Sequence, residues 1–399
     1  MTANETEGAA PARLIAAVDA ARDGLVALSD RIGNTPELGF QEEKASAWHA
    51  SVLEQAGFEV QRPYAGMPTA FRAAMQGSGP GPTVALLAEY DALPDIGHAC
   101  GHNLHGVMST GAALALAQCR DAWPGRLLVF GSPAEEGAVD GAGGKVVLVS
   151  AGAFEGVDAA MMVHSSTGNI LSMPSLAREA FEITFRGKPA HAAAIPHEGI
   201  NALDAALLTF NAVNALRQHL TPDVRIHGII TKGGVSPNIV PEYAEIRMYA
   251  RAADAGYLKE VVEKVKNCAR GAAQATGAKM GWRATAHPYQ NMITNEALAG
   301  AFADALGTLG APLQASPRRG SGSTDMGNVS QVVPSVHPYI SISDEYVPGH
   351  SREFAACAVS PRGHDGMVLG AKTLALTALR ILTSPDLVRA MKEEFVVRG

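Results

Sequence analysis

The segment HACGHNLHG surrounds Cys100 with three histidines, in a chain that has only four cysteines. Further along the chain, Glu135 and Glu136 are adjacent and His164 ends an apolar stretch. Thiolate, imidazole and carboxylate groups together suit zinc, and they also admit manganese, cobalt or nickel. We therefore predict a divalent metal site that contains Cys100, His102, a glutamate and His164.

Each of these residues alone is weak evidence. A single histidine at the end of a strand is more often a hydrogen-bonded structural residue, and CGH alone could be a thiol nucleophile beside its base. Glu135 and Glu136 could also form a solvated turn. Taken jointly, the three clusters favour a metal site over these alternatives.

The adjacent glutamates suggest two different tasks. Neighbouring side chains in an extended turn point in different directions, so one carboxylate can bind a metal while the other handles a proton. A metal lowers the pKa of a water molecule, and a nearby carboxylate can take its proton and return it to a leaving amine. This pattern predicts hydrolysis.

The elements that must position these residues alternate along the chain. Apolar stretches typical of strands covered on both faces occur at 83–90, 126–133 and 159–165, with helical patterns between them at 106–118 and 145–151. This order predicts an α/β fold, with a mainly parallel open sheet and helices on both faces. Ligands bind such sheets at the carboxyl ends of the strands, which is where Asp91, Glu135 and His164 lie.

A second domain is predicted between residues 177 and 289. Its elements follow the order β-α-β-β-α-β, which is typical of a small antiparallel sheet with two helices on one face. Strands are expected at 178–187, 224–231, 243–252 and 279–285, and helices at 201–216 and 256–275. We predict an inserted ferredoxin-like α+β lid or dimerisation domain, with residues 1–176 and 290–399 forming the catalytic domain.

Composition excludes several classes of protein. The net charge is −7 and no basic run is present, so nucleic acid is not an expected partner. The first residues lack the apolar core of a secretory signal, and we expect no later segment of roughly 18 apolar residues to span a membrane. The four scattered cysteines do not resemble a disulfide framework, which predicts a cytoplasmic location.

Several motifs together resemble a known family. AEYDALPDIGHACGHN, GSPAEEG, MMVHSS, SGSTDMGNVS and PGHSREF resemble the dinuclear metal-dependent amidohydrolases, which include aminoacylases, glutamate-releasing carboxypeptidases and auxin-conjugate hydrolases. The closest branch is similar to p-aminobenzoyl-glutamate hydrolases and aminoacyl-dipeptidases. The resemblance runs in order from about Ile32 to Leu382.

The resemblance implies roles for particular residues. Cys100 would bridge two metal ions, and the further ligands would be His102, Glu136, His164 and His350. Glu135 would be the general base and acid, and Asp91 would orient a ligand from beneath the metals. The implied cofactor is one or two divalent ions per chain, with zinc or manganese foremost and cobalt or nickel admissible.

The resemblance also implies substrate contacts from the inserted domain. His191 would stabilise the oxyanion at the substrate's carbonyl, although it could be a surface histidine. Asn238 and Arg251 would hold the substrate's backbone or carboxylate, with a strand-face salt bridge as the alternative for Arg251. Gly322 and Ser323 would lie in a loop whose backbone amides face the substrate, unless that loop is a plain structural turn.

Asn103 departs from the pattern. Many members of the resembled family have aspartate at this position. If the missing carboxylate acted near the metals, one metal site would be weaker and a single bound ion is conceivable.

The sequence thus predicts a hydrolase that cleaves the amide C–N bond of a small N-acyl or N-aroyl amino acid or a dipeptide. One alternative is a hydrolytic deaminase that displaces an amino group from a small aromatic or heterocyclic compound. Another is an inactive metal-binding protein. The expected partners are a small-molecule substrate and a second copy of the chain, in a homodimer or a higher oligomer, without nucleic acid or membrane.

Overall fold

The computed structural model describes residues 3–317 and 322–398. The chain folds into two compact units. The first unit takes in residues 3–174, 292–317 and 325–398, and the second takes in 175–291 together with 322–324. Each unit has its own hydrophobic core, so each is described by itself.

The first unit is built on a six-stranded sheet in the order β1-β2-β4-β3-β5-β11. Neighbours among β4, β3, β5 and β11 run parallel, whereas β2 is antiparallel to β4 and β1 is antiparallel to β2. The strands are β1 (Glu59–Gln61), β2 (Phe71–Gln76), β3 (Thr83–Glu89), β4 (Arg126–Ser132), β5 (Ala159–Met161) and β11 (Ser335–Val336). The predicted, mainly parallel open sheet is confirmed.

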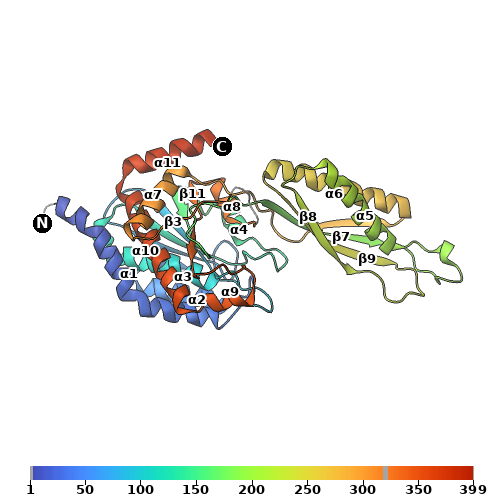
Figure 1. The fold of residues 1–399 in the computed structure, drawn as a ribbon, viewed down its shortest axis with the longest axis horizontal. Coiled ribbons are helices and arrows are strands. Elements are labelled where there is room, and N and C mark those ends of the chain that lie inside the picture. Colours follow the sequence, from blue (N-terminus) through green and yellow to red (C-terminus); the bar gives the residue numbers. More distant parts are fainter. Residues whose placement is uncertain (1–2, 318–321, 399) are drawn as a thin grey trace. The chain divides into compact units, whose positions relative to one another are not determined.

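Helices cover both faces of this sheet, as predicted (Figure 1). One face packs against α1, α3, α7 and α10, and the opposite face packs against α4 and α8. The helices are α1 (Ala3–Gly33), α2 (Glu43–Gln55), α3 (His102–Gln118), α4 (Gly144–Ser150), α7 (Glu296–Thr308), α8 (Met326–Ser330), α9 (Arg352–Cys357), α10 (Pro361–Thr383) and α11 (Pro385–Arg398).

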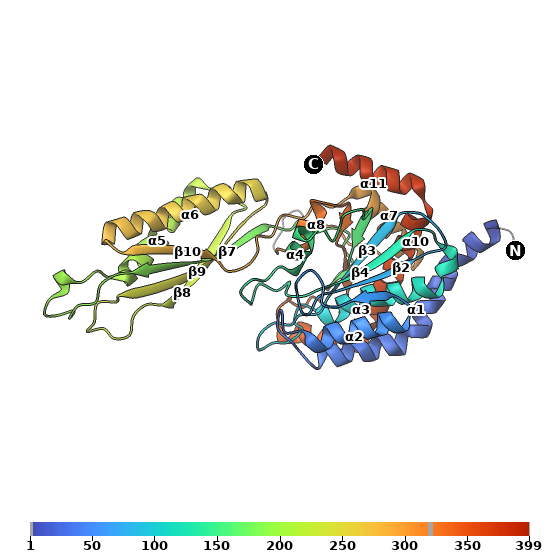
Figure 2. The ribbon, with the colours of Figure 1, turned by 180° about the vertical axis from the view of Figure 1, so that it is seen from behind.

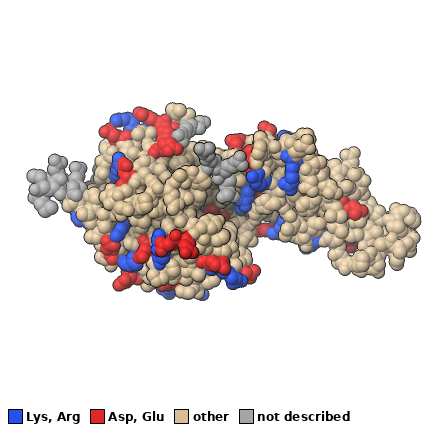
Figure 3. All heavy atoms as spheres, in the orientation of Figure 1, with Lys and Arg blue, Asp and Glu red and all other residues tan. Residues whose placement is uncertain are grey.

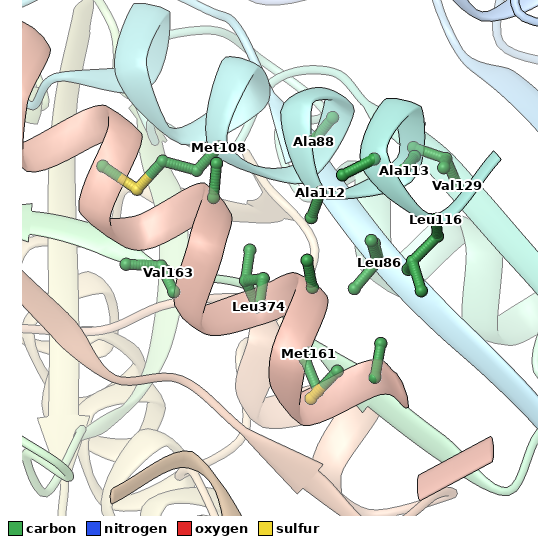
Figure 4. Close-up of a cluster of buried hydrophobic side chains, with 14 of the residues drawn as sticks. Leu86, Ala88, Met108, Ala112, Ala113, Leu116, Val129, Met161, Val163 and Leu374 are labelled. Atoms are coloured by element: carbon green, nitrogen blue, oxygen red, sulfur yellow. The ribbon is translucent and has the colours of Figure 1, made fainter. Parts of the chain in front are cut away.

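The alternation of strand residues explains these two layers. Leu86 and Ala88 of β3 point into the larger core, where Figure 4 shows them with Met161 and with Leu374 of α10. Leu87, between them, points into the smaller core on the other face. A strand that is apolar at every position is therefore buried on both sides, because successive side chains point to opposite faces.

The expectation about membrane-spanning segments needs a correction. By length and composition α10 is apolar enough to cross a membrane, although no such segment was expected. The helix is 78% buried over its most apolar stretch and lies beside α3 and α1 in the views of Figures 1 and 2. Its apolar character is explained by its position in the core of the first unit.

The second unit has a four-stranded sheet in the order β10-β7-β9-β8, in which every pair of neighbours is antiparallel. The helices α5 and α6 pack on one face of it (Figure 2). The elements are β7 (Ala177–Arg186), α5 (Ala202–Leu216), β8 (Arg225–Lys232), β9 (Tyr243–Ala252), α6 (Ala255–Thr276) and β10 (Lys279–Ala284). The predicted β-α-β-β-α-β order and the ferredoxin-like arrangement are confirmed.

Charged side chains of both signs are interspersed over the face of the first unit that Figure 3 shows. A large field of one sign, as nucleic-acid-binding proteins present, is not seen on this face.

Candidate metal centre

The structure brings the predicted metal ligands of the first unit together. Asp91 follows β3 directly, and Glu135 and Glu136 lie in the loop after β4. His102 begins α3, so Cys100 lies in the turn before that helix. His164 begins β6 (His164–Ser166), which pairs with β12 (Tyr339–Ser341) in a separate two-stranded sheet. His350 arrives from the loop before α9.

His102 is held in one orientation by Asp91. Its Nδ1 donates to Asp91 Oδ1 at 2.9 Å and lies 3.0 Å from the Asp91 carbonyl oxygen. The proton on Nδ1 leaves Nε2 as a lone-pair donor, and Nε2 is buried without a hydrogen-bond partner. Asp91 Oδ2 also accepts a hydrogen bond from the backbone N–H of Glu136 at 2.9 Å. One carboxylate therefore orients two of the predicted ligands.

His164 is oriented in the same way. Its Nδ1 donates to the carbonyl oxygen of Ser165 at 2.7 Å, and its Nε2 lies 3.4 Å from Cys100 Sγ. Burial, with a contribution from His102, lowers the pKa of His164 to about 4. The imidazole is therefore neutral at physiological pH, which is the form that binds metals.

Cys100 belongs to two groups of donor atoms. One group joins Cys100 with His102 and His164, and the other joins it with Glu136 and His350; within each group the ligand atoms lie within 4.8 Å of one another. His350 Nε2 is 3.6 Å from Glu136 Oε1. Two atoms that share one tetrahedral ion lie roughly 3.3–3.8 Å apart, because each is about 2.0–2.3 Å from the ion. The spacings fit such sharing.

These residues fit divalent cations. His102 Nε2 and Glu136 Oε1 are both buried without a hydrogen-bond partner, and buried polar atoms in native proteins are almost always satisfied. Sulfur, nitrogen and carboxylate oxygen are the donor types that zinc accepts. A cation between these atoms would supply the missing partner for both.

The loops that carry these residues adopt unusual backbone conformations. Ala134 and His350 have positive φ angles of 54° and 59°. Non-glycine residues are uncommon in this region and gather at functional sites. The buried carboxylate of Glu42 holds the first of these turns, since Glu42 Oε1 accepts from Ala134 N at 2.9 Å. The second is held by His350 N, which donates to the Ala99 carbonyl oxygen at 2.9 Å.

The electrostatics of the site call for positive charge. Burial raises the pKa of Glu135 well above its usual range, and the neighbouring Glu89 and Glu136 carboxylates add to the shift. Burial also raises the pKa of the Cys100 thiol. Bound cations reverse both effects, because they favour thiolate and carboxylate forms.

A buried ion-pair cluster behind the site was not anticipated from the sequence. The Lys145 ammonium pairs with Glu89 and with Asp325 Oδ1, the latter at 2.6 Å, and all three side chains are almost fully buried. Asp325 Oδ2 also accepts from Lys145 N at 2.9 Å. Carboxylate oxygens of Glu89, Glu135 and Asp325 lie within 4.8 Å of one another. In this group Lys145 already supplies a cation.

The predicted substrate-binding residues all lie in the second unit. His191 and Asn238 are exposed on adjacent backbone segments, where Ala192 N donates to the Asn238 carbonyl oxygen at 3.0 Å. Arg251 Nη1 donates to Ser323 Oγ at 3.2 Å. The Gly322 carbonyl accepts from Leu176 N at 2.8 Å. The structure thus brings Arg251 and Ser323 together, and His191 and Asn238 together.

Asn103 has a different role from the one considered above. Its Nδ2 donates to Ser29 Oγ at 3.1 Å and to the Ala358 carbonyl oxygen at 2.9 Å, which ties α1 and the end of α9 to α3. An aspartate there would face the Ala358 carbonyl with a negative charge. The contact that orients His102 comes from Asp91, so the amide of Asn103 is explained by packing between helices.

Comparison with known proteins identifies the family. The sequence matches Peptidase family M20/M25/M40 over residues 85–380, more than half of its length. The chain belongs to this family. It is 41% identical over 394 residues to the Xaa-Arg dipeptidase of Mus musculus, covering 95% of this chain and 90% of that protein. It is 29% identical over 453 residues to a p-aminobenzoyl-glutamate hydrolase polypeptide of Escherichia coli, covering 95% and 93%.

Solved structures share the fold. The aminobenzoyl-glutamate utilization protein of Klebsiella pneumoniae matches with a TM-score of 0.73 at 18% identity, covering 91% of this chain and 97% of that one. A dinuclear metal-binding peptidase of the M20 family from Bacillus subtilis matches with a TM-score of 0.66 at 21% identity, covering 91% and 99%. The predicted resemblance is confirmed, and the chain is a metal-dependent hydrolase of the M20 family.

Proposed function

We propose that this M20 hydrolase cleaves dipeptides that carry a free C-terminal carboxylate, at a centre of two divalent ions, with zinc or manganese as the metal. The observation that carries this proposal is the position of Cys100, whose sulfur is common to two groups of ligand atoms. A shared thiolate is the ligand that two adjacent cations require. The ligands of the proposed centre are Cys100, His102, Glu136, His164 and His350.

Divalent cations bound there would lower the pKa of a water molecule and polarise the scissile carbonyl. Glu135 takes the proton from the attacking water and returns it to the leaving amine. Asp91 holds His102 and the backbone of Glu136 in place through the two hydrogen bonds described above. His191 donates to the oxyanion, and Asn238, Arg251, Gly322 and Ser323 hold the remainder of the substrate.

The substrate class is proposed from the relatives. Two of them act, by their names, on Xaa-Arg dipeptides and on p-aminobenzoyl-glutamate. Both kinds of substrate have an amide bond whose nitrogen belongs to an amino acid with a free carboxylate. Because the more similar relative is the dipeptidase, dipeptides ending in arginine are the first substrates to test.

A substrate panel tests this function. Purified protein loaded with manganese or zinc is incubated with dipeptides ending in arginine, lysine, glutamate and leucine, with p-aminobenzoyl-glutamate, with N-acetyl amino acids and with aminoaromatic compounds. We expect mass spectrometry to detect a released amino acid from at least one dipeptide. Ammonia from an aminoaromatic compound as the only product would replace this function with the deaminase alternative. No turnover of any compound would favour an inactive binding protein.

We also propose that the second unit forms a homodimer. Strand β8 lies at the edge of its sheet, and Ile229 on this strand is 64% exposed. Leu207 and Leu208 on α5 are 46% and 41% exposed. Edge strands and apolar patches of this kind invite pairing. Light scattering should give the mass of a dimer for the wild type and of a monomer for Ile229→Lys; a monomeric wild type would refute the proposal.

The four cysteines are free thiols. They suit a reducing cytoplasm, which we propose as the location of the protein.

A further inference from the structure

The helix-free face of the second unit carries two arginines side by side. Helices α5 and α6 pack on Phe181, Ile183 and their neighbours at alternate positions of β7. Arg178, at an odd number of residues from these, points to the other face. Arg178 is directly opposite Arg251 in the register of β7 and β9. Side chains directly opposite each other lie on the same face, with Cβ atoms about 5 Å apart.

Arg178 is buried but not neutralised. The residue is only 3% exposed, and its Nε and Nη2 donate to no acceptor among the described residues. Its guanidinium carbon lies 3.8 Å from the ring centroid of Tyr289 and 5.2 Å from that of Tyr249. Two backbone hydrogen bonds of 2.9 Å between Arg178 and Tyr289 fix the first ring in place. Rings on which the guanidinium stacks orient it, but they leave its in-plane N–H groups without acceptors.

Other arginines of the same face have carboxylate partners. Arg247 Nε and Arg283 Nη2 both bind Glu182 Oε2, at 3.1 and 2.7 Å. Arg251 donates to the neutral hydroxyl of Ser323 and lies 5.9 Å from the ring centroid of Tyr249, the ring that Arg178 also contacts. Two guanidinium groups thus converge at one end of the sheet. An anion between them would relieve their repulsion and satisfy the N–H groups of Arg178.

We propose that Arg178 acts with Arg251 to bind the C-terminal carboxylate of the substrate. The planar fork of a guanidinium matches the two oxygens of a carboxylate, so two such groups select an anion strongly over a neutral amide. This inference rests on the proposed function, and it adds Arg178 as a determinant of specificity. It requires substrates to end in a free carboxylate.

The test compares a substrate with its uncharged analogue. Steady-state kinetics are measured with the best dipeptide and with the same dipeptide as its C-terminal amide, for the wild type, Arg178→Met, Arg178→Lys and the matched control Arg247→Met. A charge-assisted hydrogen bond corresponds to a factor of about ten to one hundred in affinity. We expect Arg178→Met to raise KM for the acid by that factor, leave the amide unchanged and leave kcat within about threefold.

The controls separate binding from folding. Arg247→Met should keep the preference for the acid, since Glu182 retains Arg283 as partner. Arg178→Lys should restore part of the preference, because it keeps the charge without the fork. Arg178→Met should melt at the same temperature as the wild type or higher, because an unpartnered buried cation costs stability. A lower melting temperature with an unchanged preference would overturn the proposal and make Arg178 a structural residue that binds only a buried water.

A failure of the proposed function would be seen separately, as a wild type that hydrolyses neither the acid nor the amide. Calorimetric titration with L-arginine and L-argininamide then tests the site directly. Binding of L-arginine to the wild type that is lost in Arg178→Met would support the carboxylate site. Equal binding to both proteins, or binding to neither, would overturn it.

Discussion

At the scale of single residues, Asp91 organises the centre without being one of the proposed ligands. Its two carboxylate oxygens accept from His102 Nδ1 and from the backbone of Glu136. Partners of this kind fix the tautomer and direction of a ligand, and their loss typically costs about 10–100-fold in metal affinity. We predict a loss of this size for Asp91→Ala, measured by competition with a chelator.

The matched control for this change is Asp95→Asn, which removes an exposed carboxylate four residues away in the same loop. It should leave metal affinity unchanged. Equal affinity of the Asp91→Ala protein and the wild type would remove Asp91 from the account of the site.

The type and position of a residue determined what the sequence could predict at this scale. Cys100, His102, Glu136 and His164 follow apolar strands and combine donor types that metals prefer, so their convergence was predictable. Lys145 gives no such signal, because a lysine at the start of a helix usually faces solvent. Its burial depends on Asp325, which is distant in sequence, and only the folded chain brings the two together.

At the scale of elements, the same ion-pair cluster joins three parts of the first unit. Glu89 ends β3, Lys145 lies in the first turn of α4, and Asp325 precedes α8. Removing one partner of a buried pair leaves an uncompensated charge and costs about 3–5 kcal/mol. We predict a loss of this size in the free energy of unfolding for Lys145→Met, measured by urea denaturation.

The double variant Lys145→Met with Asp325→Asn tests the cause. The asparagine oxygen can still accept from the backbone N–H of residue 145, and one orphaned charge is removed. The double variant should therefore be more stable than the sum of the two single changes. Additive effects would show that the ion pair is not what joins these elements.

Long elements were predicted more accurately than short ones. The strand predicted over 83–90 is β3 (Thr83–Glu89), and the helix predicted over 201–216 is α5 (Ala202–Leu216). The single strand predicted over 159–165 is divided, because His164 leaves the main sheet and pairs with Tyr339. The antiparallel strands β1 and β2 were missed, since six or fewer residues carry little periodicity and their pairing depends on distant β4.

At the scale of the whole molecule, buried neutral histidines set the response to acid. His49 lies between α2 and α3, where its Nδ1 is 2.8 Å from Thr110 Oγ1, and burial lowers its pKa to about 3. Unfolding restores the ordinary pKa, so the unfolded chain takes up a proton that the folded chain refuses. The stability that His49 contributes is complete above about pH 6.5 and is lost as the pH falls towards 3.

Urea unfolding at about pH 7.5 and about pH 5.5 measures this effect. The wild type should lose about 1.4 kcal/mol between these two pH values through His49 alone. His49→Gln should lose that much less over the same interval, whatever its stability at the higher pH. A pH dependence identical to that of the wild type would contradict the assignment.

The order of elements predicted two units, but it did not predict that residues 322–324 join the second one. That contact depends on Arg251 and on Leu176, and no local pattern in the sequence marks it.

The central claim is that Cys100 and its neighbours hold two cations at which Glu135 moves the proton. The most direct test measures metal content by elemental analysis and dipeptide turnover together, for the wild type and for Glu135→Gln. We predict about two divalent ions per chain in both proteins. We predict that Glu135→Gln lowers kcat by about 10²–10⁴-fold, since it loses a general base that is also the acid. Near-native turnover in Glu135→Gln, or a single ion per chain in the wild type, would contradict the account.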